Sequence, residues 1–258
     1  MHHLIRFELS KYLHNSILKA LLSFTVKLEM WQKETFDPAL IRREVTLASS
    51  LGFNTLRVYL HDLVWTHDGD AFLQRLDQFL GIANDQKMKT IFVLFDDCHR
   101  PDPVYGKQPK PVKGVHNSVW KQSPVSQTVL PLQYPLNFHL CTQGAAVVRK
   151  FHDGSVSELE VTRLKAYVTT VIRRFASDSR VLMWDLYNEP GNSGMGNKSF
   201  QLLQYTWDWA QAVRPSQPLV GHSNCSPLFI SLSYYQKVDC LRCWFGRQDE
   251  QGLEPCPF

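Results

Sequence analysis

The sequence predicts an α/β protein with a central parallel sheet, of the (β/α)8 barrel type, and three observations support this class. Apolar, strand-like segments alternate along the chain with longer segments whose apolar residues recur at helical spacing. Strands that alternate with helices pair in parallel through right-handed crossovers. The run 181–191 begins as an apolar strand and ends in Asn188, Glu189 and Pro190, and barrel enzymes place their chemistry at the C-terminal ends of such strands.

Four segments are predicted as strands. The segment 89–96 contains the uninterrupted apolar run 91–95, which is typical of a strand buried on both faces. A short strand is expected at 54–60, a third at 181–187 and one more at 217–222. The interval between neighbouring strands is in each case long enough for a helix, as the barrel architecture requires.

Four segments with apolar residues at helical spacing are predicted as helices, namely 38–52, 70–88, 159–176 and 198–213. The first has clear boundary signals. Asp37 is suited to be its N-cap, Pro38 occupies the first turn, and Gly52 sits just past the last turn.

Length and composition suit a globular protein with a sizeable core. A chain of 258 residues has the size of one barrel, which takes about 250 residues, with two small domains as the alternative. Hydrophobic residues make up 44% and charged residues 20%. The net charge of +4 is too small and too dispersed to indicate nucleic acid. No apolar run approaches the roughly 20 residues of a membrane span, so no membrane partner is expected.

The N-terminal stretch 1–27 is predicted to be an extension of unclear order. It is basic, and polar residues interrupt its apolar residues, so it lacks the core of about 7 to 15 apolar residues found in a signal peptide. An amphipathic basic leader is the alternative. The cellular compartment therefore stays open.

The six cysteines do not indicate a metal site. Cys240 and Cys243 form a close pair, and Cys225 and Cys256 would complete a set of four thiolates, but the other spacings match no zinc motif. A disulfide among them is the alternative. We therefore expect neither a metal nor a cofactor.

Four motifs occur in order along the chain and together carry a family resemblance. The most specific is Trp184-Asp-Leu-Tyr-Asn-Glu-Pro190; the others are the segments 29–37, 56–59 and 95–99. They resemble parts of glycoside hydrolase family 5, or of a close relative in the same barrel clan. The segment 29–37 resembles the stretch after the first strand, 56–59 the second strand, 95–99 the end of the third strand, and 184–190 the fourth strand. The resemblance covers a partial barrel at 28–222, apart from an atypical insert at 125–150.

The resemblance implies a role for five residues. Glu189 would be the general acid/base, and Asn188 would hydrogen-bond the sugar 2-hydroxyl, a contact that strengthens in the oxocarbenium-like transition state. Arg57 would orient the nucleophile, and His99 would line the subsite where the glycosidic bond is cleaved. Trp120 lies on a long loop where it would stack on a sugar ring.

Two polar residues of the predicted strands also have structural interpretations. Arg57 lies inside a strand and needs a partner if it is buried, so a purely structural ion pair with Asp96 or Asp97 is the alternative to a role at the nucleophile. Asp185 is expected to point to the other side of Trp184 and to pack within the barrel wall.

The remaining candidates have plainer interpretations as well. Glu189 would otherwise be a loop carboxylate, His99 a surface histidine and Trp120 a packing residue. Pro190 disfavours the helical region for Glu189, so we expect Glu189 to be extended and its carboxylate to project from a fixed platform.

The retaining mechanism that the resemblance implies needs a second carboxylate about 5 to 5.5 Å from the first. In the family this nucleophile is a glutamate at the end of the seventh strand. The stretch 190–258 is too short for four further strand–helix units of about 30 residues each. Glu250 and Glu254 lie in a stretch rich in Gly, Pro and Cys and are not expected to serve. We therefore expect a barrel that is incomplete after about strand five, with an atypical tail at 223–258 and an unassigned nucleophile.

Three functional interpretations stay open. The first is a retaining glycoside hydrolase that cleaves a β-linked polysaccharide by double displacement. The second is a carbohydrate-binding pseudoenzyme without catalysis, and the third is a truncated product without stable fold or activity. The partner expected in the first two is an oligosaccharide or polysaccharide, while the oligomeric state and the glycan itself stay open.

Overall fold

The computed structural model of the chain describes residues 5–8, 21–24, 28–97, 103–109, 123–127, 141–142, 144–191 and 196–221. Within these ranges no helix is long and apolar enough to cross a membrane. The atypical tail expected at 223–258, with its four cysteines, lies outside them.

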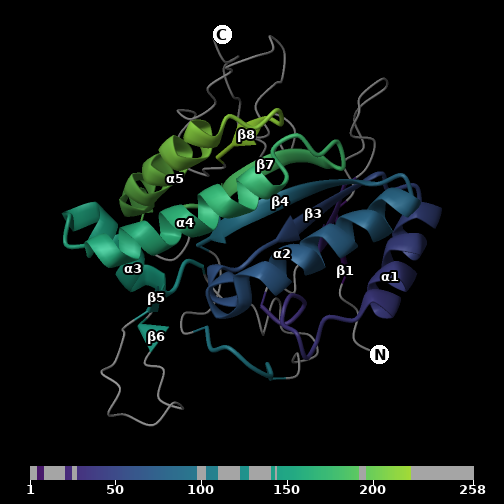
Figure 1. Cartoon of the computed structure of the whole chain (residues 1–258), viewed down its shortest axis with the longest axis horizontal. Coiled ribbons are helices and arrows are strands. Elements are labelled where there is room, and N and C mark those ends of the chain that lie inside the picture. Colours follow the sequence, from purple (N-terminus) through teal and green to yellow (C-terminus); the bar gives the residue numbers. More distant parts are fainter. Residues whose placement is uncertain are drawn as a thin grey trace, which may run out of the picture.

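A six-stranded sheet forms the centre of the molecule (Figure 1). In spatial order its strands are β1 (Ile5–Glu8), β2 (Leu21–Phe24), β3 (Thr55–Tyr59), β4 (Lys89–Asp96), β7 (Val181–Asn188) and β8 (Leu219–Val220). β1 is antiparallel to β2, and every other neighbouring pair is parallel. From β2 onward the strands therefore follow one another in chain order, as they do in a barrel wall.

The helices that connect the parallel strands all cover the same face of this sheet (Figure 1). They are α1 (Pro38–Ser50), α2 (Asp62–Asp85), α4 (Glu158–Arg174) and α5 (Ser199–Val213), with α3 (Gly144–Asp153) leading into α4. A doubly wound sheet would instead reverse its strand order and carry helices on both faces. Sequential strands with one-sided helices are the winding of a (β/α) barrel, so the predicted fold class is confirmed.

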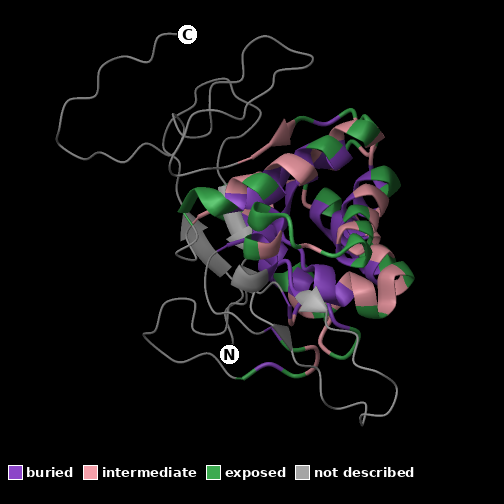
Figure 2. Ribbon diagram, turned by 90° about the vertical axis from the view of Figure 1, so that its left-hand side faces the viewer, coloured by how far each residue is buried: buried purple, intermediate pink, exposed green. Residues whose placement is uncertain are grey.

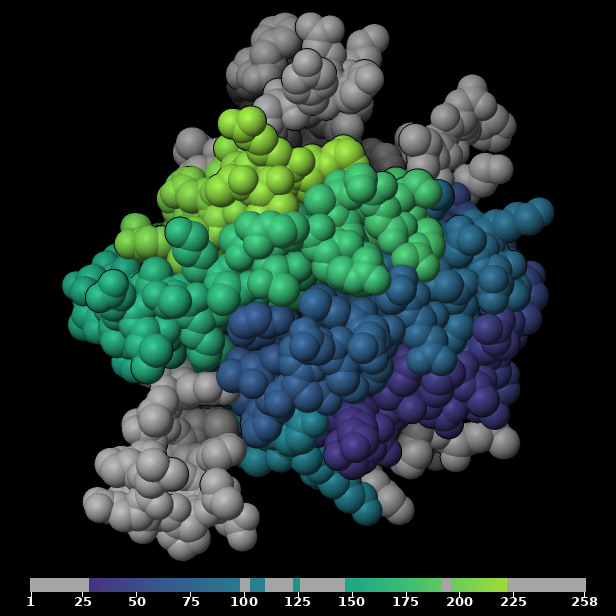
Figure 3. Space-filling model, in the orientation of Figure 1, coloured from purple at the N-terminus to yellow at the C-terminus, as the bar shows by residue number. Residues whose placement is uncertain are grey.

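Figure 3 shows the outer face of these helices, over which the chain proceeds in order from the N-terminal to the C-terminal segments. Buried residues gather where the helices meet the sheet, as Figure 2 shows. Phe92 of β4, for example, lies 5.7 Å from the ring of Trp184 and 6.4 Å from that of Phe175, and all three are fully buried. Burying each such side chain stabilises the fold by about 1.5–3 kcal/mol.

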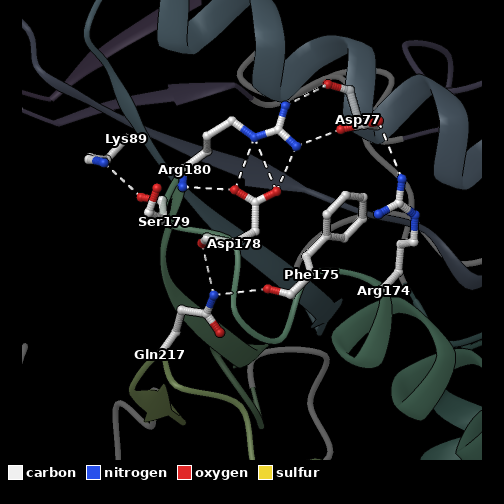
Figure 4. Close-up of polar contacts among 8 residues, drawn as sticks. All are labelled: Asp77, Lys89, Arg174, Phe175, Asp178, Ser179, Arg180 and Gln217. Carbon is white, nitrogen blue, oxygen red and sulfur yellow. Dashed lines mark hydrogen bonds and ion pairs between the residues drawn. The ribbon is translucent and has the colours of Figure 1, made fainter.

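A polar network ties the elements together at the end of the sheet where the parallel strands begin (Figure 4). Arg180, just before β7, donates to Asp77 of α2 at 2.5 Å and to Asp178 at 2.6 Å. Gln217, just before β8, donates to the carbonyl of Asp178 at 2.9 Å. The hydrogen bond from Arg180 lowers the pKa of Asp178, against the opposing effect of burial. Contacts at this end of a barrel serve stability.

The N-terminal stretch contributes to the sheet. We expected 1–27 to be an extension of unclear order, but β2 lies within it and pairs in parallel with β3, from Leu21 opposite Thr55 to Phe24 opposite Val58. β2 thus occupies the position of the first barrel strand. The prediction of a separate boundary at residue 28 stays a prediction.

Two helices differ from the prediction. α2 begins at Asp62 and not at residue 70, and the non-helical backbone of Asp68 (φ −151°, ψ 62°) divides it into two pieces, of which only the second had been predicted. The atypical insert 125–150 had no element assigned to it, and α3 begins inside it. Its Val147, Val148 and Phe151 are buried, so it is anchored by an apolar face.

Candidate functional site

Arg57 of β3 is the centre of a buried polar network that spans three strands. Its Nε donates to Asp185 Oδ2 at 3.1 Å, and its Nη2 contacts the same oxygen. Nη2 also donates to Asn188 Oδ1 at 2.8 Å, while Nη1 donates to the hydroxyl of Tyr59. Arg57 therefore joins its own strand to the end of β7, across the intervening strand β4.

Sheet geometry explains this arrangement. Arg57 and Tyr59 are two residues apart on β3, so their side chains share one face of the sheet. Arg57 is opposite Ile91 of β4, and Asp185 of β7 is opposite Val93, two positions further along the same strand. A long guanidinium side chain bridges this offset in the strand direction.

Burial and charge act in opposite directions on Arg57. The side chain of Arg57 is 17% exposed and that of Asp185 only 2%. Burial alone would lower the pKa of Arg57, but the neighbouring oxygens of Tyr59 and Asp185 outweigh it and raise this pKa above its usual value. The guanidinium is therefore a permanent cation in the site.

Asn188 is held at both ends of its side-chain amide. Its Oδ1 accepts from Arg57, and its Nδ2 donates to Asp96 Oδ1 at 2.6 Å. Asn188 is only 4% exposed, and its backbone is paired opposite Asp96 at the ends of β7 and β4. The orientation of this amide is thus fixed before any ligand binds.

Glu189 follows directly and adopts a left-handed backbone with φ of +46°. The expectation that Pro190 would hold it extended is therefore wrong. Two other described non-glycine residues have positive φ, Lys87 and Arg214. Both lie just beyond helix ends, where left-handed residues commonly terminate helices. Glu189 instead follows a strand, and a left-handed non-glycine residue costs of order 1–3 kcal/mol, a strain that concentrates at functional sites.

Asp97, the first residue after β4, contacts the same turn. Its backbone N–H donates to the carbonyl of Asn188 at 3.1 Å. Its Oδ2 accepts from the backbone N–H of Gly191 at 2.7 Å and from the hydroxyl of Ser199 at 2.5 Å, and its Oδ1 accepts from the hydroxyl of Tyr187 at 3.3 Å. Burial and then the charge of Asp97 raise the pKa of Tyr187 well above its usual value. Asp97 thus joins β4, β7 and α5 around Glu189.

The structure places some of the predicted residues together and leaves others outside its described part. Arg57 and Asn188 are in contact, and the half-buried Glu189 is the next residue. The structural partner proposed for Arg57 was Asp96 or Asp97, but its partner is Asp185 of β7, whose side chain takes part in this network. His99 and Trp120 lie outside the described residues.

Three residues of this network were not anticipated from the sequence. Tyr59 could have been found from its spacing of two residues after Arg57, which is the period of a strand face. Ser199 and Tyr187 meet Asp97 only through the packing of α5 on β7, and no local pattern encodes that contact. Within the described ranges no group of three or more His, Cys, Asp and Glu residues is placed to hold a metal ion.

No protein-family model and no curated protein matches this sequence. Similar solved structures include a GH5_18 protein from Streptomyces cattleya in complex with GlcNAc, at 12% identity and a TM-score of 0.44, covering 75% of this chain and 41% of that chain. A β-mannanase from the blue mussel Mytilus edulis matches at 9% identity and a TM-score of 0.47, covering 75% and 54%. An endo-β-1,4-mannanase from Thermotoga petrophila matches at 12% identity and a TM-score of 0.46, covering 83% and 44%.

The chain spans about half or less of the length of these solved structures. The strand order and the one-sided helices by themselves define a protein of the (β/α) barrel class. Its fourth parallel strand, β7, ends in a turn that carries a carboxylate.

Proposed function

We propose that this chain is a glycoside hydrolase of the retaining type, acting on O-glycosidic bonds of a β-linked polysaccharide, with Glu189 as the general acid/base. The observation that carries the proposal is the left-handed Glu189 at the end of β7, between the fixed amide of Asn188 and Pro190. Glu189 has a strained backbone and lies at the C-terminal end of a barrel strand. This is the position where barrel enzymes place their catalytic groups.

The neighbours of Glu189 suit glycoside chemistry. In the first step a protonated Glu189 would donate its proton to the leaving oxygen while an enzyme carboxylate attacks the anomeric carbon. In the second step the ionised Glu189 would take a proton from the water that attacks the glycosyl-enzyme. Asn188, oriented by Arg57 and Asp96, would contact the sugar 2-hydroxyl. His99 and Trp120 are proposed to complete the sugar-binding surface.

The nucleophile is proposed to lie outside the described residues. Three described carboxylates adjoin the site, and each already forms an ion pair or a hydrogen bond within the protein. Asp185 pairs with Arg57, Asp96 accepts from Asn188, and Asp97 accepts from Gly191. A nucleophile must instead face the anomeric carbon about 5 to 5.5 Å from the acid/base.

The test is release of reducing ends from a panel of β-mannan, β-glucan and β-xylan by the purified full chain. The wild type is expected to turn over at least one of them, and Glu189→Gln is expected to lose at least about 100-fold in rate, the usual contribution of general acid/base catalysis. Glu158→Gln, which makes the same change at an exposed residue on α4, is expected to keep the wild-type rate.

A folded wild type that releases no sugar but shows a higher melting temperature with added oligosaccharide would contradict hydrolysis. That result would instead support the second candidate, a carbohydrate-binding pseudoenzyme. The observation that favours this candidate is that all three described carboxylates beside Glu189 are already engaged.

A further inference from the structure

Asp97 fixes the turn that carries Glu189 from both sides. On one side its backbone N–H donates to the carbonyl of Asn188 at 3.1 Å, and on the other its carboxylate accepts from the N–H of Gly191 at 2.7 Å. Glu189 and Pro190 are the only residues between these two anchor points. Asp97 itself is only 2% exposed and is the first residue after the neighbouring strand β4.

The geometry of Gly191 leaves little freedom for this turn. Its φ is +98°, and a Cβ atom built on it would lie 2.7 Å from the carbonyl oxygen of Gly196. The N–H of Gly196 donates back to the carbonyl of Gly191 at 3.3 Å. The turn is therefore closed against the segment that leads into α5, and the carboxylate of Asp97 joins its Gly191 end to the end of β4.

Two further donors orient the carboxylate of Asp97. Ser199, the first residue of α5, donates to Oδ2 at 2.5 Å, and Tyr187 donates to Oδ1 at 3.3 Å. With both oxygens occupied, the carboxylate cannot rotate without breaking a hydrogen bond. Because its donors come from β7, from the turn and from α5, a small displacement of any one of them is opposed by the others.

We propose that Asp97 is a positioning residue that holds Glu189 in its left-handed conformation, and so sets the direction in which the Glu189 carboxylate points. The inference rests on the proposed function for its catalytic consequence, but the clamp itself is independent of turnover. A left-handed glutamate does not persist on its own, because it costs of order 1–3 kcal/mol and needs surroundings that impose it. Asp97 supplies those surroundings.

A merely structural role is the competing explanation. The N-cap residue of α5, Lys198, makes no side-chain capping bond, so a carboxylate near this helix start would also stabilise α5. The two roles predict that replacing Asp97 affects different parts of the molecule. A positioning residue affects the turn 188–191 and the catalytic rate, whereas a helix stabiliser affects α5 and the overall stability.

The first test is hydrogen exchange of the Gly191 amide, measured by NMR in the full chain. Asp97→Ala is expected to speed this exchange by at least about tenfold, because the amide loses a charged acceptor. Asp97→Asn keeps one accepting oxygen and is expected to fall between Asp97→Ala and the wild type. Asp178→Ala, at the opposite end of the sheet, is expected to leave the exchange within about twofold of wild type.

The second test separates kcat from KM on the β-glycan that the wild type cleaves. Asp97→Ala is expected to lower kcat by about 100-fold with KM changed less than about threefold, because a misplaced acid/base affects the chemical step. Asp97→Asn is expected to recover at least about tenfold of that loss, as a partial substitute for the lost acceptor.

Each outcome decides the proposal. Unchanged Gly191 exchange in Asp97→Ala overturns it, and so does faster exchange spread evenly over β4, β7 and α5, which would assign Asp97 to stability. If Asp97→Ala does not fold, the exchange in Asp97→Asn decides in the same way. If the wild type cleaves no glycan, the proposed function fails, while the Gly191 exchange still supports or overturns the clamp.

Discussion

Arg57 of β3 and Asp185 of β7 form an ion pair across the intervening strand β4, with Arg57 Nε 3.1 Å from Asp185 Oδ2. The second carboxylate oxygen, Oδ1, is buried and accepts no hydrogen bond from any described residue. Arg57 is therefore the main compensation for a buried negative charge. The same guanidinium orients Asn188, so one residue links the stability of the sheet to the geometry of the candidate site.

Replacing Arg57 with Met is expected to lower the free energy of unfolding by about 3–5 kcal/mol, because it leaves Asp185 buried and uncompensated. Urea unfolding at neutral pH measures this. The double variant Arg57→Met/Asp185→Leu is expected to recover most of the loss, since an apolar pair needs no charge compensation. If Arg57→Met lowers the free energy of unfolding by less than about 1 kcal/mol, the burial of the Arg57–Asp185 ion pair is contradicted.

The left-handed Glu189 gives a prediction of its own. Glycine adopts positive φ without the steric penalty that any Cβ atom brings. Glu189→Gly is therefore expected to be more stable than Glu189→Ala by about 1 kcal/mol, measured by urea unfolding of the two variants. At Glu44, in the interior of α1, the same pair of variants is expected to rank in the opposite order. An alanine variant at 189 that equals or exceeds the glycine variant would contradict the left-handed conformation.

Two buried tyrosines predict a loss of stability at high pH. Burial, followed by Asp62 for Tyr167 and by Asp97 for Tyr187, raises the pKa of both hydroxyls well above the usual value. The folded state therefore holds protons that the unfolded state releases. Stability is full below the unfolded pKa of about 10 and falls as pH rises above it, by about 1.4 kcal/mol per pH unit for each tyrosine.

Urea unfolding between about pH 8 and pH 11 measures this slope. Tyr187→Phe is expected to reduce this slope by about 1.4 kcal/mol per pH unit, the contribution of one tyrosine. It is also expected to lower the free energy of unfolding at neutral pH by about 1 kcal/mol, because the hydrogen bond to Asp97 is lost. An identical slope in Tyr187→Phe and wild type would contradict the burial of this hydroxyl.

Arg180 predicts a loss of stability at low pH. Its hydrogen bond to Asp178 lowers the pKa of that carboxyl, so the stabilisation is present above the unfolded pKa of about 3.9 and is lost as pH falls through the folded pKa. Arg180→Met is expected to cost about 1 kcal/mol at neutral pH, and the difference from wild type is expected to shrink below about pH 4.

Arg42→Met is the matched control for this variant. Arg42 pairs with Asp85 at 2.8 Å, but both side chains are more than half exposed, at 53% and 54%. Exposed pairs contribute little, so Arg42→Met is expected to change stability by less than Arg180→Met at neutral pH. A constant difference between Arg180→Met and wild type down to about pH 2 would contradict the role of Asp178.

Local sequence signals account for most of the fold. Asp37 and Pro38 predict the start of α1, and the side chain of Asp37 accepts from the backbone N–H groups of Ala39 and Leu40 as an N-cap should. The apolar run of β4 predicts a strand with the observed bounds Lys89–Asp96. These elements are determined within a few residues of the chain, so periodicity and capping residues are sufficient to find them.

The errors have a common physical cause, since each depends on contacts between distant segments. The first piece of α2 was missed, and its contacts are long-range: Asp62 Oδ2 accepts from the backbone N–H of Val125 at 3.2 Å and from Arg163 Nη1 at 2.9 Å. The extended Glu189 was predicted from Pro190 alone. The contacts of the turn described here come from Asp97, which follows another strand, β4, and no local rule contains them.

The most direct test of Glu189 as acid/base is chemical rescue of Glu189→Ala with azide. A dinitrophenyl β-glycoside needs no acid to leave, so the variant is expected to form the glycosyl-enzyme and then stall for lack of a base. Azide attacks the anomeric carbon without giving up a proton, displaces the enzyme carboxylate, and is expected to restore the rate with release of a β-glycosyl azide. A variant whose rate is insensitive to azide and that yields no glycosyl azide, while the wild type cleaves the same glycoside, would contradict the assignment.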